Sequence, residues 1–259
     1  MSNETDTHTY DQNFYGRQAA DSLESARQVA PFVVDLLDPK SVVDIGCGVG
    51  TWLAAFQACG IQDILGLDGS YVLESPLLIP GQSFLPADLE QAIELDRRFD
   101  LAISLEVAEH LTKSEQLVDE LSRLSDVILF SAAVPLQGGR HHINEQPASY
   151  WAGLFQAAGF TTVDILRPTF WNNSQVKWWY RQNMLLFVRD EKLQSLPSLL
   201  PYVHKPGEQI LDIIHPEGFQ EKITSSKERL AEIHLTYKRR MSDLKKEIWE
   251  KAKRSLGKQ

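Results

Sequence analysis

Hydrophobic positions recur with a helical period in some stretches of this chain and gather into short runs in others. From Asp21 to Leu37 they return every three or four residues, which predicts an amphipathic helix that ends at Asp38-Pro39. The β-branched run Ser41–Ile45 then predicts a buried strand, and Trp52–Ala58 returns to helical composition. The chain is therefore expected to begin with a helix, a strand and a second helix.

The same alternation continues to about residue 159. Helical spacing over Ser114–Leu124 and Tyr150–Ala158 predicts two more helices, the second of them capped by Gly159. Repeated strand–helix alternation predicts a mostly parallel sheet with right-handed crossovers. The further strands predicted for this sheet are Ile64–Leu67, Ser83–Pro86, Phe99–Leu105 and Val127–Ala132.

Two later stretches, Thr161–Leu166 and Val176–Val188, are rich in β-branched and aromatic residues. They predict two strands that form an antiparallel hairpin at the edge of the sheet. Alternation within the second stretch would place Trp178 and Tyr180 on one sheet face and Trp179 on the other. We expect these aromatic side chains to pack the edge of the core.

The C-terminal part carries an apolar stripe at helical spacing from Glu217 onward. It predicts a long amphipathic helix or a short coiled coil. Because such a stripe needs a partner, we expect self-association or docking to another protein through this helix. The stripe consists of Ile223, Leu230, Ile233, Tyr237, Met241, Leu244 and Ile248.

These patterns divide the chain into four parts. We expect a flexible segment over 1–20, a main α/β domain over 21–190, a connecting segment over 191–216 and the basic amphipathic helix over 217–259. At 259 residues the chain is long enough for one such domain with an appendage.

Charge is distributed unevenly along the chain. The formal net charge of −9 combines a net +5 over residues 216–259 with a net −14 over the residues before them. An acidic body makes nucleic acid an unexpected partner for the main domain. The composition, 43% hydrophobic and 24% charged, excludes collagen-like and wholly disordered classes.

The chain also lacks the marks of a secreted or membrane-spanning protein. Its N-terminus has neither the basic nor the apolar region of a signal peptide, and no apolar run reaches the length needed to cross a bilayer. Two cysteines, Cys47 and Cys59, cannot form a disulfide framework. We therefore expect a cytoplasmic protein.

A glycine-rich turn follows the first predicted strand. Glycine lets the chain turn sharply and lets a ligand approach the backbone of Gly46-Cys47-Gly48-Val49-Gly50. Asp68 follows the second strand about 20 residues on, where an acid can accept hydrogen bonds from a ribose. Asp88 follows the third strand, where it can meet an adenine amino group while Leu89 covers the ring. Three successive strand ends thus offer the groups that an adenosine needs.

This combination resembles the class I S-adenosylmethionine (SAM) methyltransferases over roughly residues 41–188. The resemblance implies a Rossmann-like fold, the SAM cofactor and a methyltransferase domain at 21–190. Asp44 would hold the cationic amino-acid end of SAM, directly or through the glycine loop. The cofactor-binding residues it implies are Asp44, Gly46, Cys47, Gly48, Asp68, Gly69, Asp88, Leu89 and Glu106.

A dinucleotide oxidoreductase fits the same turn less well. That class needs Gly-x-Gly-x-x-Gly to leave room for a pyrophosphate, whereas the third glycine here, Gly50, comes one residue early. Asp44 also precedes the loop, where it would repel a phosphate.

A candidate metal site follows the fourth strand. Glu106, Glu109 and His110 would converge if their segment formed one helical turn, and His142 follows the fifth strand on the facing loop. The pattern is similar to that of metal-dependent small-RNA 2′-O-methyltransferases, and its first half to ubiquinone-pathway O-methyltransferases. That likeness implies that these four residues bind Mg²⁺ or Mn²⁺ and that Glu145 supports the ligands without binding the metal itself. The RNA enzymes have a tryptophan after the glutamate that corresponds to Glu145, whereas this chain has Gln146-Pro147.

A metal-free mechanism is the alternative. His110, His141 or His142 would then be the catalytic base, because an imidazole titrates near neutral pH. In both cases we expect O-methylation of a hydroxyl on a sugar-containing small molecule or glycan. The competing hypotheses are an RNA 2′-O-methyltransferase and a nonenzymatic SAM-binding partner subunit.

Overall fold

The computed structural model describes residues 12–74 and 76–256 of the chain. The first helix, α1 (Gln12–Leu37), begins earlier than the predicted start at Asp21. Residues 1–11 of the segment expected to be flexible lie outside the described residues. As predicted, α1 ends before Asp38, whose φ of 47° breaks the helical geometry.

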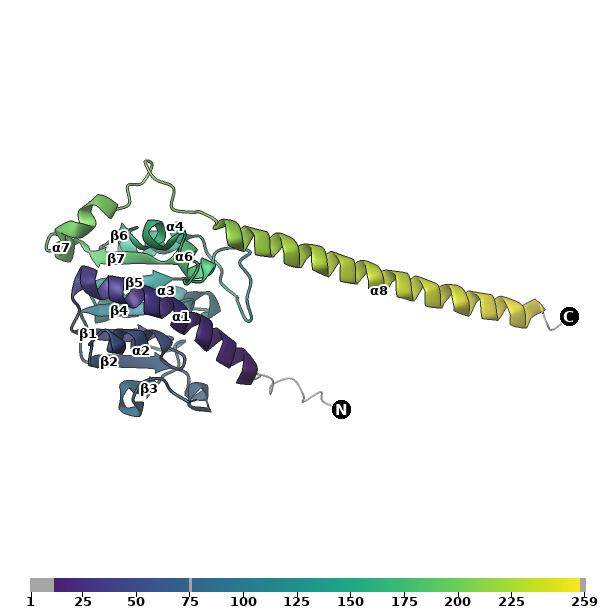
Figure 1. Cartoon of the computed structure of the whole chain (residues 1–259), viewed down its shortest axis with the longest axis horizontal. Helices are drawn as coiled ribbons and strands as arrows, with labels where there is room; N and C mark the ends of the chain where they lie inside the picture. The colour runs from purple at the N-terminus through teal and green to yellow at the C-terminus, as the bar shows by residue number, and fades with distance from the viewer. Residues whose placement is uncertain (1–11, 75, 257–259) are drawn as a thin grey trace. The chain divides into compact units, whose positions relative to one another are not determined.

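The strands form one seven-stranded sheet in the order β3-β2-β1-β4-β5-β7-β6 (Figure 1). The strands from β3 to β5 in this order pair in parallel, whereas β7 is antiparallel to both β5 and β6. The predicted fold class is therefore confirmed, with its mostly parallel sheet and antiparallel edge. The strands are β1 (Ser41–Ile45), β2 (Asp63–Asp68), β3 (Phe84–Pro86), β4 (Leu101–Leu105), β5 (Val127–Ser131), β6 (Phe160–Val163) and β7 (Leu185–Arg189).

Helices cover both faces of the sheet and give the protein two apolar cores. The core on one face contains α1 and α2, and the core on the other contains α3 and α4. Strands β1, β4 and β5 are buried at every position because both of their faces are covered. The remaining α-helices are α2 (Thr51–Ala58), α3 (Ser114–Leu124), α4 (Ala148–Ala157), α5 (Leu166–Phe170), α6 (Trp178–Asn183), α7 (Asp190–Leu193) and α8 (Pro216–Leu256).

The predicted strand over Val176–Val188 is wrong in its first half. Residues 178–183 form the helix α6, so Trp178 and Tyr180 do not share a sheet face, and only Leu185–Arg189 forms a strand. Tertiary contacts hold this helix in place, because the Tyr180 ring packs edge-on against Trp52 at 5.1 Å. The aromatic composition of this segment is typical of a strand, but its side chains pack against α2 as part of a helix.

The strand expected over Thr161–Leu166 is shorter than predicted, because β6 ends at Val163 and α5 begins at Leu166.

The long C-terminal helix is confirmed. It is α8, which begins at Pro216 and forms a unit separate from the preceding residues. Within the described residues, no helix is long and apolar enough to span a membrane.

An aromatic cluster under the antiparallel edge stabilises the sheet. The rings of Phe155 in α4 and Phe187 in β7 stack with centroids 4.0 Å apart, and Phe130 of β5 packs edge-on against Phe155. Because Phe155 is 0% exposed, its removal leaves a cavity between α4 and the sheet.

We expect Phe155→Ala to lower the free energy of unfolding by about 3–5 kcal/mol, measured by urea denaturation. Phe219→Ala is the matched control, because Phe219 is 60% exposed in α8 and its loss should change the free energy by less than about 0.5 kcal/mol. Equal effects of the two changes would contradict this account of the core.

Candidate functional site

The glycine turn after β1 adopts backbone angles that other residues rarely reach. Gly46, Gly48 and Gly50 have φ values of 83°, 52° and 86°. A Cβ atom on Gly46 would lie 2.3 Å from a side-chain carbon of Val107. Glycine is therefore required at Gly46 both by the turn and by the close approach of the next loop.

The backbone N–H groups of this turn are already engaged. Those of Gly46 and Cys47 donate to the carbonyl of Leu67 at 2.8 and 3.1 Å, and that of Gly50 donates to the carbonyl of Cys47 at 2.9 Å. The N–H of Gly48 donates to the carboxylate of Asp68 at 2.7 Å. These donors are used within the fold, so the turn does not offer them as a cradle for a pyrophosphate.

Asp68 ends β2 beside the turn, as the sequence predicts. In addition to the N–H of Gly48, its carboxylate accepts the N–H of Gly69 at 2.7 Å and the hydroxyl of Tyr71 at 2.6 Å. These donors fix the carboxylate at the carboxyl end of the strand. Since Oδ1 already accepts two of these bonds, a ribose hydroxyl would bind at the remaining lone pair of Oδ2 or in place of the Tyr71 hydroxyl.

Asp44 lies within β1 and is only 3% exposed. Its Oδ2 atom has no hydrogen-bond partner among the described residues. Burial, and secondarily the charge of Asp68, raises the pKa of this carboxyl well above its usual range. A cationic group at this place would satisfy the carboxylate, which fits the amino-acid end of SAM.

The other predicted cofactor residues lie close to these acids. The N–H of Ala87 donates to the carbonyl of Asp68 at 2.8 Å, which brings the chain around Asp88 beside the end of β2. Asp88 itself is exposed, and Leu89 is partly buried against the apolar core. The thiol of Cys47 is buried, its pKa is raised mainly by that burial, and it donates to the carbonyl of Gly48 at 3.3 Å.

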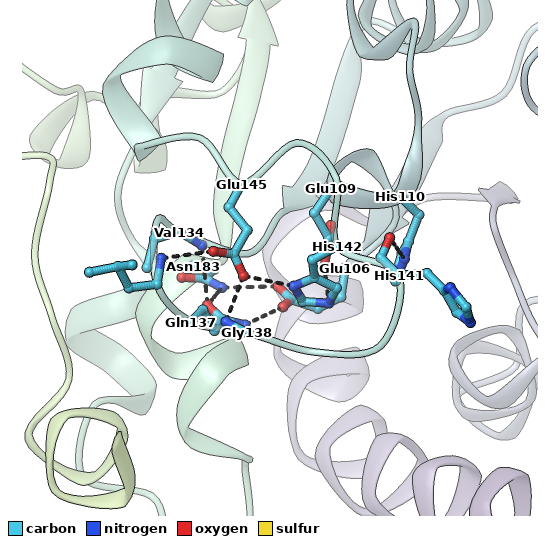
Figure 2. Close-up of polar contacts among 11 residues, drawn as sticks. Glu106, Glu109, His110, Val134, Gln137, Gly138, His141, His142, Glu145 and Asn183 are labelled. Carbon is cyan, nitrogen blue, oxygen red and sulfur yellow. Dashed lines mark hydrogen bonds and ion pairs between the residues drawn. The ribbon is translucent and has the colours of Figure 1, made fainter. Parts of the chain in front are cut away.

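A second group of polar residues gathers where the loops after β4 and β5 meet (Figure 2). Glu106 has a φ of 56°, and two amides hold its carboxylate. Gln137 donates to one oxygen at 2.8 Å and Asn183 donates to the other at 3.1 Å. Burial raises the pKa of Glu106, and these amide hydrogen bonds oppose the shift.

Glu109 is 0% exposed, and neither of its carboxylate oxygens has a hydrogen-bond partner among the described residues. Burial, followed by the charge of Glu106, raises its pKa well above the usual range. Its backbone carbonyl accepts the N–H groups of Ile143 and Asn144 at 2.9 and 3.0 Å. This pair of bonds ties the loop after β5 to the loop after β4.

Two imidazoles face this carboxylate. The rings of His110 and His142 lie edge-on with centroids 4.8 Å apart, and Nε2 of His142 is 3.9 Å from Oε1 of Glu109. Nδ1 of His110 is 3.2 Å from the carbonyl of His141, and Nδ1 of His142 is 2.9 Å from the carboxylate of Glu145. These acceptors favour the proton on Nδ1 of each ring, which leaves a lone pair on Nε2.

The three side chains can hold a cation. One ligand atom from each of Glu109, His110 and His142 lies within 4.8 Å of the others, and a cation would supply the partner that buried Glu109 lacks. The pKa of His110 is lowered, mainly because its ring is partly desolvated although the residue as a whole is exposed, and this favours the neutral imidazole that a metal ligand or base requires.

Glu106 is not part of this group, although its spacing suggested that it would be. Residues 108–110 form a 3₁₀ turn rather than the α-helical turn assumed from the spacing, and the Glu106 carboxylate is held by Gln137 and Asn183 instead. His141 is exposed, and its backbone carbonyl is the atom that contacts His110.

Sequence analysis did not identify the side chains that bind the carboxylates of Glu106 and Asp68. Gln137 and Asn183, which bind Glu106, belong to no recognisable motif, and Asn183 lies in a segment predicted as a strand. Tyr71, which binds Asp68, is likewise not part of a motif. Only the three-dimensional arrangement identifies them.

The strand order, the glycine turn, the acid within β1 and the acid at the end of β2 are together those of a SAM-dependent methyltransferase. The model of the family described as "Methyltransferase domain" matches residues 15–165. Since this is more than half of the chain, the protein belongs to that family and is a SAM-dependent methyltransferase.

Individual known proteins resemble parts of the chain. The mitochondrial ubiquinone biosynthesis O-methyltransferase of Dictyostelium discoideum is 29% identical over 104 residues, which cover 34% of this chain and 32% of that protein. The match thus spans about a third of the relative's length.

Two solved structures show the same fold at low sequence identity. DesVI of Streptomyces venezuelae has a TM-score of 0.52 at 15% identity and covers 68% of this chain and 95% of its own. The sugar N-methyltransferase KedS8 of a Streptoalloteichus species has a TM-score of 0.52 at 16% identity and covers 73% and 96%. At such identities the likeness concerns the fold alone.

We expect Asp68→Asn to weaken SAM binding about tenfold to a hundredfold, measured by calorimetry, because an amide replaces a charged acceptor that the loop N–H groups orient. Asp63→Asn is the control, since Asp63 lies exposed at the other end of the same strand. If the two variants bound SAM equally well, Asp68 would have no part in the cofactor site.

Proposed function

We propose that this methyltransferase transfers the methyl group of SAM to a hydroxyl of a sugar-containing small molecule or glycan, assisted by a divalent cation. The observation that carries the proposal is the buried carboxylate of Glu109, which has no hydrogen-bond partner among the described residues and faces His110 and His142. One carboxylate and two imidazoles are suitable ligands for a divalent ion.

Each residue has a distinct part in this proposal. Glu109, His110 and His142 would hold Mg²⁺ or Mn²⁺, and Glu145 fixes the ring of His142 through Nδ1. The bound ion would lower the pKa of a hydroxyl and hold adjacent oxygens of the acceptor. Glu106 borders the same space on the side of Gln137 and Asn183.

The cofactor half of the site positions the reacting methyl group. Asp68 would hold the ribose of SAM, and Asp44 would pair with the ammonium group at its amino-acid end. Rate enhancement then depends chiefly on placing the hydroxyl oxygen in line with the methyl carbon. In the metal-free alternative His110, neutral because its pKa is lowered, accepts the hydroxyl proton.

The choice of acceptor rests on charge and on reaction type. The body, residues 1–215, carries a net charge of −14, which opposes a polyanionic RNA acceptor and suits a neutral polyhydroxyl compound. A relative with partial coverage is named as an O-methyltransferase. The relative supports transfer to an oxygen, and the charge supports an acceptor that is not a nucleic acid.

We expect Mn²⁺ to bind the isolated protein and to raise its melting temperature, and Glu109→Gln to abolish both effects. Without metal the variant should be at least as stable as the original protein, because it removes a buried carboxylate that lacks a partner.

Glu191→Gln is the matched control for Glu109→Gln. Glu191 is exposed in α7, which follows antiparallel β7 and so lies at the opposite edge of the sheet. Retention of Mn²⁺ binding by Glu109→Gln, measured by calorimetry, would remove this residue from the metal site.

We expect methyl transfer from isotope-labelled SAM to a sugar-rich fraction of cell metabolites to stop in EDTA and to return with Mg²⁺ or Mn²⁺. Mass spectrometry would locate the label on a sugar oxygen. Full activity in EDTA would support the histidine base, and label recovered as 2′-O-methylnucleosides after nuclease digestion would show an RNA acceptor instead.

A further inference from the structure

The long helix α8 carries an apolar stripe that nothing in its own unit covers. Large apolar side chains in it are strongly exposed, among them Leu230 at 65%. The stripe is longer than the sequence periodicity alone suggested, because Phe219 extends it toward the start of the helix. We define the apolar stripe as Phe219, Ile223, Leu230, Ile233, Tyr237, Met241 and Leu244.

Basic side chains border this stripe on both sides. Residues three or four positions apart are neighbours on a helix surface, so Lys227, which lies four after Ile223 and three before Leu230, adjoins the stripe. The same spacing places five more exposed cations along its two borders. The basic rims are Lys227, Lys238 and Lys245 on one side, and Lys222, Arg229 and Arg240 on the other.

Acidic side chains gather on the face opposite the stripe. Glu228 and Glu232 each lie two positions from Leu230, which places them on the far side of the helix, and Glu221 and Asp243 lie on the same line. Arg239 and Lys246 also lie on this back, and Glu247 lies on one rim, but acids outnumber bases on the back and bases outnumber acids on the rims. The helix therefore has an apolar stripe, two mainly basic rims and a mainly acidic back. A helix face that serves only to meet water has no need for such an order.

From this order we propose that α8 lies on an anionic lipid surface, with the apolar stripe in the bilayer interface and the basic rims at the level of the lipid phosphates. Helices that lie in the plane of a membrane have this combination of a continuous apolar face and cationic borders. The residues over 216–259 carry a net charge of +5, which attracts them to anionic lipid. This inference does not depend on the identity of the methyl acceptor.

A second copy of α8 is a poor partner for the stripe. Residues that border a helix seam meet those of the partner helix, so pairing two copies brings basic rims together. The seven-residue repeat also fails at Arg240, seven positions after Ile233, and the steps of three, four and four depart from the heptad of a left-handed coiled coil. A lipid surface requires no such register and supplies the opposite charge.

The test uses the full-length protein with vesicles of phosphatidylcholine alone or mixed with phosphatidylglycerol. We expect the protein to sediment with the anionic vesicles, to remain free with the neutral ones and to be released by high salt. An absence of binding to anionic vesicles at low salt would overturn the proposal, as would equal binding to both vesicle types.

Two leucines of α8 provide a matched pair of variants. Leu230→Ser should weaken partitioning into anionic vesicles about fivefold or more, because Leu230 lies in the stripe. Leu235→Ser should change it little, since Leu235, although 51% exposed, lies outside the stripe. Equal effects would show that the stripe does not face the lipid.

Charge is tested with two lysines. Lys238→Gln removes a rim charge and should weaken partitioning about fivefold, whereas Lys246→Gln, on the acidic back, should have a smaller effect. SAM affinity should be unchanged in all four variants. If light scattering without lipid instead showed a dimer that Leu230→Ser dissociates, the stripe would be a protein interface and the proposal would fail.

Discussion

The parallel pairing of β1 with β2 on one side and β4 on the other determines where the polar residues of this protein meet. Parallel strands end at the same edge of a sheet, and backbone bonds from Gly46 and Cys47 to the carbonyl of Leu67 extend that pairing beyond β1 itself. Asp68 then accepts the next N–H of the turn. Asp68 thus owes its position beside the turn to backbone hydrogen bonds.

The site contains groups that oppose folding. Asp44 and Glu109 are buried carboxyl groups with oxygens that lack partners among the described residues, and burial raises the pKa of each. The apolar cores on both faces of the sheet supply the stability that this arrangement requires. Unsatisfied polar groups concentrated at one edge are typical of a site that binds charged ligands.

The sequence predicted what depends on local patterns. The alternation of strands and helices predicted the sheet, and the sequence also predicted that Asp68 ends the second strand, which the structure confirms. The predictions that failed concern segments whose conformation depends on contacts between residues far apart in the sequence. Helix α6 forms because Tyr180 packs on Trp52, and Glu106 turns toward Gln137 and Asn183 because its backbone has a positive φ. Neither feature can be predicted from the spacing of residues along the sequence.

The hydrogen bond between Asn183 and Glu106 joins residues 77 positions apart, whereas Gly48 and Asp68 are separated by 20. Closing a longer loop costs more chain entropy, so contacts between distant residues tend to form later in folding. The half of the site formed by the glycine turn and Asp68 can therefore assemble from a short stretch of chain. The half around Glu106 depends on the last strands of the sheet, and a nascent or truncated chain would acquire the two halves in that order.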